Sequence, residues 1–168
     1  SGTEGIKQYV QLMQIAWQNN QRANYVDGIV NIQGDTPVFD IDLVQTIMKK
    51  MNFYTRSVVT GYYEVDANDK QYHDQKYVKI AMAGPPMAAY FSRQNIPTYA
   101  KRRKIHIGIY GYNAWDLAKT EFAENEENLE QLNFIENNTK IICIKGKPSI
   151  SIDTAEDLKI FQEYLDAT

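Results

Sequence analysis

Residues 28–35, Gly28-Ile-Val-Asn-Ile-Gln-Gly-Asp35, show most clearly which class of fold this chain adopts. The first six form a short run rich in β-branched side chains, which is typical of a strand, and Gly34-Asp35 is a turn signal that ends it. Asp40 then occupies an N-cap position, because apolar residues follow it at helical spacing: Ile41, Val44, Ile47, Met48 and Met51. The sequence here predicts a strand, a turn and a helix in succession.

The alternation of strands and helices continues on both sides of this unit. Before it, residues 6–20 carry apolar side chains at helical spacing. After it, the pattern predicts strands over residues 57–60, 78–83, 87–92, 105–112 and 141–145, and helices over residues 114–121, 126–137 and 153–165. Strands that alternate with helices predict an α/β fold with a doubly wound, mostly parallel (mixed), Rossmann-like sheet.

Residues 61–104 interrupt this rhythm. Residues 61–75 are polar and rich in tyrosine, which favours a long loop. The next two predicted strands are joined across the turn signal Gly84-Pro85-Pro86, as in a hairpin. We therefore expect a single α/β domain over residues 1–168, in which residues 61–104 form a small, β-rich inserted sub-domain.

Composition excludes several classes of protein. The chain has 168 residues, 43% of them hydrophobic, and 21 acidic against 18 basic side chains give a net charge of -3. A general nucleic-acid binder is usually basic, and no run approaches the roughly 18 apolar residues of a membrane span. Cys143 is the single cysteine, so it forms no internal disulfide, and its isoleucine-rich surroundings favour inert core. We expect a soluble, cytoplasmic domain with no nucleic-acid or membrane partner.

Two polar clusters follow predicted secondary structure at places where α/β sheets bind ligands. Gln33 and Asp35 come at the end of the first strand, where an ordinary strand-to-helix turn is the alternative interpretation. Thr154 and Asp157 have capping-box spacing, which accounts for both residues and leaves Asp153 without a role. If Asp35 and Asp153 meet at one sheet edge, they suit Mg²⁺, a hard cation that keeps water ligands and takes phosphate oxygens.

A third cluster lies in the strand Lys104-Ile-His-Ile-Gly-Ile-Tyr-Gly-Tyr112. Alternation places His106 on the face opposite the isoleucines, together with Gly108 and Tyr110, and Gly108 leaves room for a close approach. A satisfied core histidine is the alternative. The sequence contains no zinc ligand set by spacing, no Walker loop and no GxGxxG motif.

Six segments occur in the same order as in one enzyme family. They are Ser1-Gly-Thr3, Val30-Asn-Ile-Gln-Gly-Asp35, Ala89-Tyr-Phe-Ser-Arg93 with Ile96-Pro97, His106-Ile-Gly-Ile-Tyr110, Leu129-Glu-Gln-Leu132, and Ile152-Asp-Thr-Ala-Glu-Asp-Leu158. Together they resemble the 3-deoxy-manno-octulosonate (Kdo) cytidylyltransferases, or CMP-Kdo synthetases, and the resemblance covers essentially the whole chain.

The resemblance implies transfer of CMP from CTP to the anomeric hydroxyl of Kdo, with release of pyrophosphate, for lipopolysaccharide synthesis. It implies Mg²⁺ held by the catalytic residues Asp35 and Asp153, and a homodimer whose interface we expect in residues 61–104. The residues implied to bind the sugar are Gln33, Arg93, His106, Tyr110, Glu130 and Gln131. Ser1 and Thr3 are implied to contact the nucleotide.

The chain departs from the family pattern at Gly5, where the family has Arg, at Thr36, where it has Glu, and at Asn133, where Arg often stands. The family's Arg- and Lys-containing triphosphate loop has no counterpart in these residues, so we expect residues 1–168 alone to be inactive. Two alternatives stay open. One is an inactive sugar-binding or dimerising fragment, and the other is a sibling cytidylyltransferase for a related nonulosonic or amino-substituted sugar acid.

Overall fold

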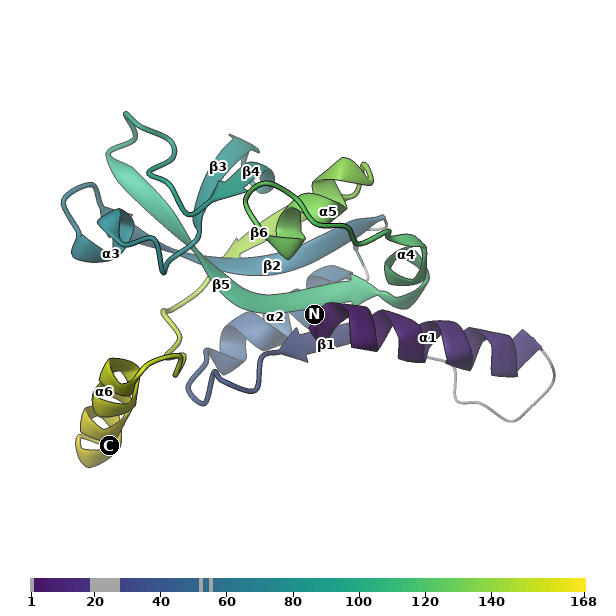
Figure 1. The fold of residues 1–168 in the computed structure, drawn as a ribbon, viewed down its shortest axis with the longest axis horizontal. Helices are drawn as coiled ribbons and strands as arrows, with labels where there is room; N and C mark the ends of the chain where they lie inside the picture. The colour runs from purple at the N-terminus through teal and green to yellow at the C-terminus, as the bar shows by residue number, and fades with distance from the viewer. Residues whose placement is uncertain (1, 19–27, 52, 55) are drawn as a thin grey trace.

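A computed structural model describes residues 2–18, 28–51, 53–54 and 56–168 of the chain (Figure 1). Its elements are α1 (Gly2–Gln18), β1 (Gly28–Ile32), α2 (Ile41–Met51), β2 (Ser57–Asp66), α3 (Lys70–His73), β3 (Lys79–Gly84), β4 (Met87–Ser92), β5 (Arg102–Asn113), α4 (Ala114–Lys119), α5 (Glu130–Glu136), β6 (Lys140–Lys145) and α6 (Ala155–Asp166). The predicted strand, turn and helix at residues 28–51 are confirmed. The end of the helix expected at residues 6–20 lies outside the described residues.

The six strands form one mixed sheet in the order β1-β5-β2-β6-β4-β3. Among the described strands only β2 and β6 pair in parallel, while β5 runs antiparallel to both β1 and β2. Lys79 of β3 also pairs with Ile105 of β5, so the sheet curls back on itself. The α/β class and the mixed character of the sheet are confirmed, but the expectation that the sheet is mostly parallel and Rossmann-like is wrong. The physical causes are β5, which returns between β1 and β2, and the tight β3–β4 turn, which forces antiparallel pairing.

The loop expected at residues 61–75 is also wrong, because β2 continues to Asp66. Tyr63 and Val65 are buried on one face of the strand, and the β2–β5 register shifts at Thr60/Gly61. The short helix α3 follows, with the Asp69 side chain as its N-cap. Residues 61–104 therefore contribute most of β2, with β3 and β4, to the same sheet as the rest of the chain.

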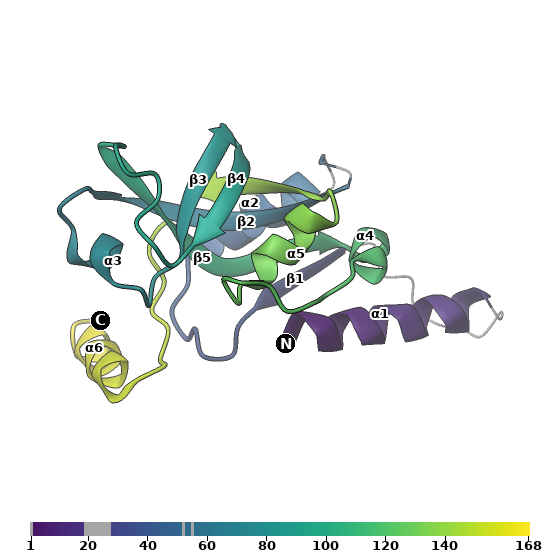
Figure 2. The same cartoon turned by 45° about the horizontal axis from the view of Figure 1, so that its top comes forward.

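The sheet carries a hydrophobic cluster on each face. Helix α2 covers one face and α5 the other, as the two views in Figures 1 and 2 show. Ile105, Ile107 and Ile109 pack on the α2 side, whereas Tyr110 and Cys143 belong to the cluster on the α5 side. Burial raises the pKa of the Cys143 thiol to about 12, which fits the inert core residue predicted from the sequence. In the part of the chain that the structure describes, no helix is both long and apolar enough to cross a membrane.

Candidate functional site

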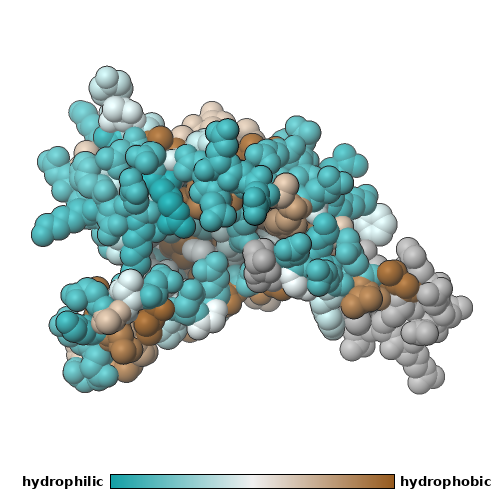
Figure 3. Space-filling view, in the orientation of Figure 1, coloured by the Kyte–Doolittle hydropathy of each residue, from teal (hydrophilic) through white to brown (hydrophobic). Residues whose placement is uncertain are grey.

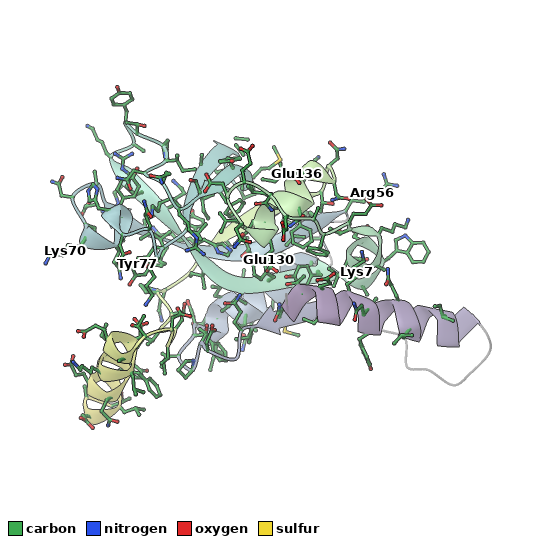
Figure 4. All side chains as sticks on the ribbon, in the orientation of Figure 1. Lys7, Arg56, Lys70, Tyr77, Glu130 and Glu136 are labelled. Carbon is green, nitrogen blue, oxygen red and sulfur yellow. The ribbon has the colours of Figure 1, made fainter. Side chains whose placement is uncertain are left out.

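A pocket of about 1130 Å³ opens on the α5 side of the sheet and extends to the segment before α6. Figure 3 shows a hollow between α6, which carries hydrophobic as well as polar side chains, and the mostly polar surface of the body of the molecule. Figure 4 labels Glu130 and Tyr77, which both line the pocket. Eight of the residues predicted for the site line it: Gln33, Asp35, Arg93, His106, Tyr110, Glu130, Gln131 and Asp153. The fold thus brings together residues from β5, α5 and the loops after β1, after β4 and before α6.

Asp35 and Asp153 lie on neighbouring segments of backbone. The N–H of Ile152 donates to the carbonyl of Asp35 at 2.8 Å, and the N–H of Ile150 donates to the carbonyl of Val38 at 2.9 Å. These two bonds tie the loop after β1 to the loop before α6. Both aspartates are exposed and line the same pocket, and their pairing at a metal ion stays a prediction.

The start of α6 explains why the Asp153 carboxylate is available. Thr154 and Asp157 form the predicted capping box, and the Asp157 carboxylate also accepts the backbone N–H of Asp153 at 3.1 Å. The Lys76 ammonium pairs with Asp157 and holds the pKa of that carboxyl down to about 2. Asp157 therefore fixes the helix, and Asp153 presents its side chain to the pocket.

The candidate metal ligands at this edge are the carboxylates of Asp35 and Asp153. Among the described residues, no group of three or more His, Cys, Asp or Glu side chains is placed to hold an ion. Two neighbouring carboxylates suit a cation that takes its other ligands from water and phosphate oxygens.

His106 is held as a neutral imidazole. The hydroxyl of Thr60 donates to the carbonyl of Ile109 at 2.8 Å, so its oxygen is left to accept from His106 Nε2–H, also at 2.8 Å. His106 Nδ1 then accepts from Gln131 Nε2 at 3.3 Å. Burial lowers the pKa of His106 to about 3. At neutral pH this residue is therefore a hydrogen-bonding group and carries no charge.

Two buried oxygens at the start of α5 have no hydrogen-bond partner among the described residues. They are Oε1 of Glu130 and Oε1 of Gln131, whose amide nitrogen donates to the Tyr110 hydroxyl at 2.7 Å. Gln131 is only 5% exposed, and burial also raises the pKa of Glu130. An unsatisfied buried polar group costs about 1–3 kcal/mol, so a hydroxyl donor that reached either oxygen would stabilise the site.

Gln33 occupies the space that Gly108 leaves open on β5. A Cβ atom at Gly108 would lie 3.2 Å from Gln33 Oε1, which is tighter than ordinary contact. The close approach expected at Gly108 is therefore made by a side chain of this chain. On the other side of the pocket, Arg93 is exposed, and its Nη1 donates to the carbonyls of Gln75 at 3.1 Å and Lys76 at 3.2 Å.

The two residues expected at the nucleotide are placed differently. Ser1 lies outside the described residues. Thr3 is 1% exposed, and its hydroxyl lies 3.2 Å from that of Tyr112, behind the pocket lining. The nucleotide contact of both residues stays a prediction.

Several pocket residues carry no clear signal in the sequence. Tyr63 donates to Gln71 Oε1 at 3.3 Å, and Gln71 Nε2 donates to the Tyr77 hydroxyl at 3.4 Å, which builds one wall. The sequence predicts a loop over residues 61–75 and so does not predict these pocket residues. The alternation of Tyr63 and Val65 is the strand signal that could have identified them. The role of Thr60 has no local signal, because it depends on how β2 pairs with β5.

Comparison with known proteins gives matches that cover most of the chain. A family model described as cytidylyltransferase matches residues 8–141. The chain belongs to the cytidylyltransferase family. Among curated members, 3-deoxy-manno-octulosonate cytidylyltransferases of Rickettsia canadensis (strain McKiel) and Rickettsia akari (strain Hartford) are each 37% identical over 147 residues. These alignments cover 84% of this chain and 58% of each relative, so the chain spans little more than half of their length.

Two solved structures have a similar fold. A CMP:2-keto-3-deoxy-manno-octonic acid synthetase complexed with CTP superposes with a TM-score of 0.78 at 24% identity, over 99% of this chain and 68% of that one. A putative glucose-1-phosphate thymidylyltransferase from Bacillus anthracis, in complex with a sucrose, has a TM-score of 0.55 at 12% identity, over 92% of this chain and 59% of that one. Both similarities concern the fold of this cytidylyltransferase family member.

Proposed function

We propose that the protein transfers CMP from CTP to the anomeric hydroxyl of Kdo and releases pyrophosphate. The observation that carries the proposal is the pocket, which gathers the two aspartates, Arg93 and the His106–Gln131 network in one place. The curated relatives are named as Kdo cytidylyltransferases, and the similar CMP-Kdo synthetase was solved as a complex with CTP. Both facts support the same reaction.

The sugar acid would bind between α5 and Arg93. Kdo carries several hydroxyl groups, and the unpaired oxygens of Glu130 and Gln131 are acceptors for two of them. Tyr110 and neutral His106 orient the Gln131 amide, which keeps this wall rigid. The planar guanidinium of Arg93 suits bidentate pairing with the Kdo carboxylate.

Asp35 and Asp153 would hold Mg²⁺, with the cation's remaining ligands being water and substrate oxygens. When bound, the metal supplies charge neutralisation at the α-phosphate and a lower pKa for the attacking hydroxyl. The protein's own part is to position the two carboxylates, which the hydrogen bond between Ile152 and Asp35 does through the backbone.

The proposal also includes nucleotide contacts by Ser1 and Thr3, a cytoplasmic location, and a homodimer. Aromatic residues are enriched at interfaces, and Tyr90 and Tyr99 of residues 61–104 are 43% and 97% exposed. Phe91, which also looks exposed in the sequence, is instead fully buried in the core. A dimer interface in this segment would therefore use the tyrosines and not Phe91.

A second candidate substrate is a related sugar acid, and Asn133 favours testing it. Asn133 is buried, lines the pocket and accepts the N–H of Ala123 at 2.8 Å, at a position where the resembled family often has Arg. The pocket therefore lacks one positive charge at this point. Initial rates with CTP and a panel of Kdo, amino-substituted Kdo and nine-carbon sugar acids separate the candidates, and the proposal predicts the highest kcat/KM with Kdo.

A further inference from the structure

Lys79 is a fully buried ammonium at the place where the sheet closes. The residue is 0% exposed. Its backbone pairs in the sheet with Ser92 of β4 on one side and with Ile105 of β5 on the other. Lysine is rarely buried completely unless its charge is paired or hydrogen-bonded. Its position therefore calls for an explanation beyond packing.

Three backbone carbonyls satisfy the Lys79 ammonium. Its Nζ donates to Asp74 at 2.9 Å, to Tyr77 at 2.7 Å and to Arg93 at 2.5 Å, which uses all three N–H groups. One of these acceptors belongs to the residue proposed to bind the sugar carboxylate. Lys79 thus joins the segment 74–77 to the backbone of Arg93.

The Arg93 guanidinium binds the two carbonyls that lie between those of Asp74 and Tyr77. Gln75 and Lys76 accept from Arg93 Nη1, so four consecutive carbonyls, of residues 74–77, face two neighbouring cations. Two cations held together raise the local positive potential, which favours an anionic ligand.

Glu127 holds the same strand end from the opposite side. Its Oε1 accepts from the Ser92 hydroxyl at 2.7 Å, and its Oε2 accepts from the backbone N–H of Arg93 at 3.4 Å. The Ser92 oxygen in turn accepts the N–H of Gln94 at 2.9 Å. The backbone of residue 93 is therefore held at its carbonyl by Lys79 and at its N–H by Glu127.

We propose that Lys79 and Glu127 form a clamp on the backbone of residue 93 and act as positioning residues for anion binding by Arg93. The clamp rests on the proposed function, because the anion it serves is the carboxylate of the sugar acid. It acts before any ligand arrives, since both contacts are made by groups of the protein. Its loss should therefore weaken binding of the sugar acid and leave binding of CTP unchanged.

The test uses Lys79→Met and Glu127→Ala in the full-length protein, with Lys104→Met as the matched control. Lys104 also lies on the sheet, and it pairs with Glu64 at 3.7 Å outside the pocket lining. We expect the KM for Kdo to rise about tenfold or more in both clamp variants, with the KM for CTP and kcat within twofold. We expect no such change in Lys104→Met. Combining either clamp variant with Arg93→Ala should give the KM of Arg93→Ala alone, because residues that act through one another are not additive.

Hydrogen exchange of the peptide that contains residues 91–95 provides a readout independent of activity. Faster exchange there in both clamp variants, together with the selective rise in KM, supports the proposal. Unchanged exchange, an unchanged KM for Kdo, or effects that add to Arg93→Ala overturn it. If Lys79→Met does not fold, Glu127→Ala decides, since Glu127 lies in a surface loop. A wild-type protein that makes no product overturns the proposed function and the clamp's role in sugar binding, while exchange still shows whether the two contacts hold residue 93.

Discussion

The backbone N–H of Ile152 donates to the carbonyl of Asp35 at 2.8 Å, and this bond sets two segments that are distant in the sequence side by side. It does so without using either side chain. The carboxylates of Asp35 and Asp153 are thus left to face the pocket. Because the backbone makes the connection, either carboxylate can be changed without removing it.

We therefore expect Asp35→Asn and Asp153→Asn to fold normally and to lose activity by more than about 100-fold, which corresponds to about 2.7 kcal/mol of transition-state stabilisation. Each variant removes one of the two carboxylates proposed to hold the cation. Turnover across a magnesium titration and the melting temperature are the measurements. Wild-type kinetics at saturating Mg²⁺ in either variant would remove that residue from the metal site.

Arg93→Ala should raise the KM for Kdo by an amount equivalent to about 2–5 kcal/mol, the cost of removing one partner of a charged hydrogen bond. The KM for CTP should move little. Arg93→Lys is the matched control, because it keeps the charge and loses the planar fork, and we expect an intermediate KM. A lower melting temperature with wild-type KM values for both substrates would instead show that Arg93 is structural.

His106→Ala should have a smaller effect than Arg93→Ala, equivalent to about 1–2 kcal/mol in the KM for Kdo. His106 contacts Gln131, through which it would act on the proposed sugar acid, and it donates and accepts as a neutral group. Thr60→Val tests the same network from the far side, because it removes the acceptor for Nε2–H. If the Kdo KM of His106→Ala equals that of wild type, the network does not orient the sugar.

Acid should destabilise the protein through His106. Burial lowers its pKa from 6.5 to about 3, so between these values the unfolded chain binds a proton that the folded chain does not. The contribution of neutral His106 is present above about pH 6.5 and is lost as pH falls, by about 2 kcal/mol between pH 7 and pH 5. Urea unfolding at both pH values measures it. We expect the free energy of unfolding of His106→Asn to fall less than that of wild type between pH 7 and pH 5. An equal fall in both proteins would contradict the neutral state of His106 in the folded chain.

Local signals in the sequence predict the parts of the fold that are built locally. The β1–turn–α2 unit and the capping box of Thr154 and Asp157 each depend on a few neighbouring residues, and both are confirmed. The direction of β5 depends on pairing with β1 and β2, which no local pattern encodes, and the local pattern therefore predicts a mostly parallel sheet. Gly61 and the polar residues after it similarly make the second half of β2 resemble a loop.

The sequence predicts the residues that face the site but not the residues that hold them in place. Asp35, Asp153 and Arg93 stand at ends of elements, where side chains leave the core, and all three line the pocket. The partners that hold them have no such signal. Lys79 appears in the sequence as an ordinary strand lysine, and only the meeting of β3, β4 and β5 shows that it is buried against the Arg93 carbonyl.

The most direct test of the central claim is a product assay with the protein purified at its full length. The protein is incubated with CTP, Kdo and Mg²⁺, and the sugar nucleotide and pyrophosphate are quantified together by mass spectrometry and a coupled assay. We expect CMP-Kdo and pyrophosphate in equal amounts, dependent on both substrates and reduced more than about 100-fold in Asp35→Asn. Neither product from the wild-type protein, or pyrophosphate release that does not depend on Kdo, would contradict it.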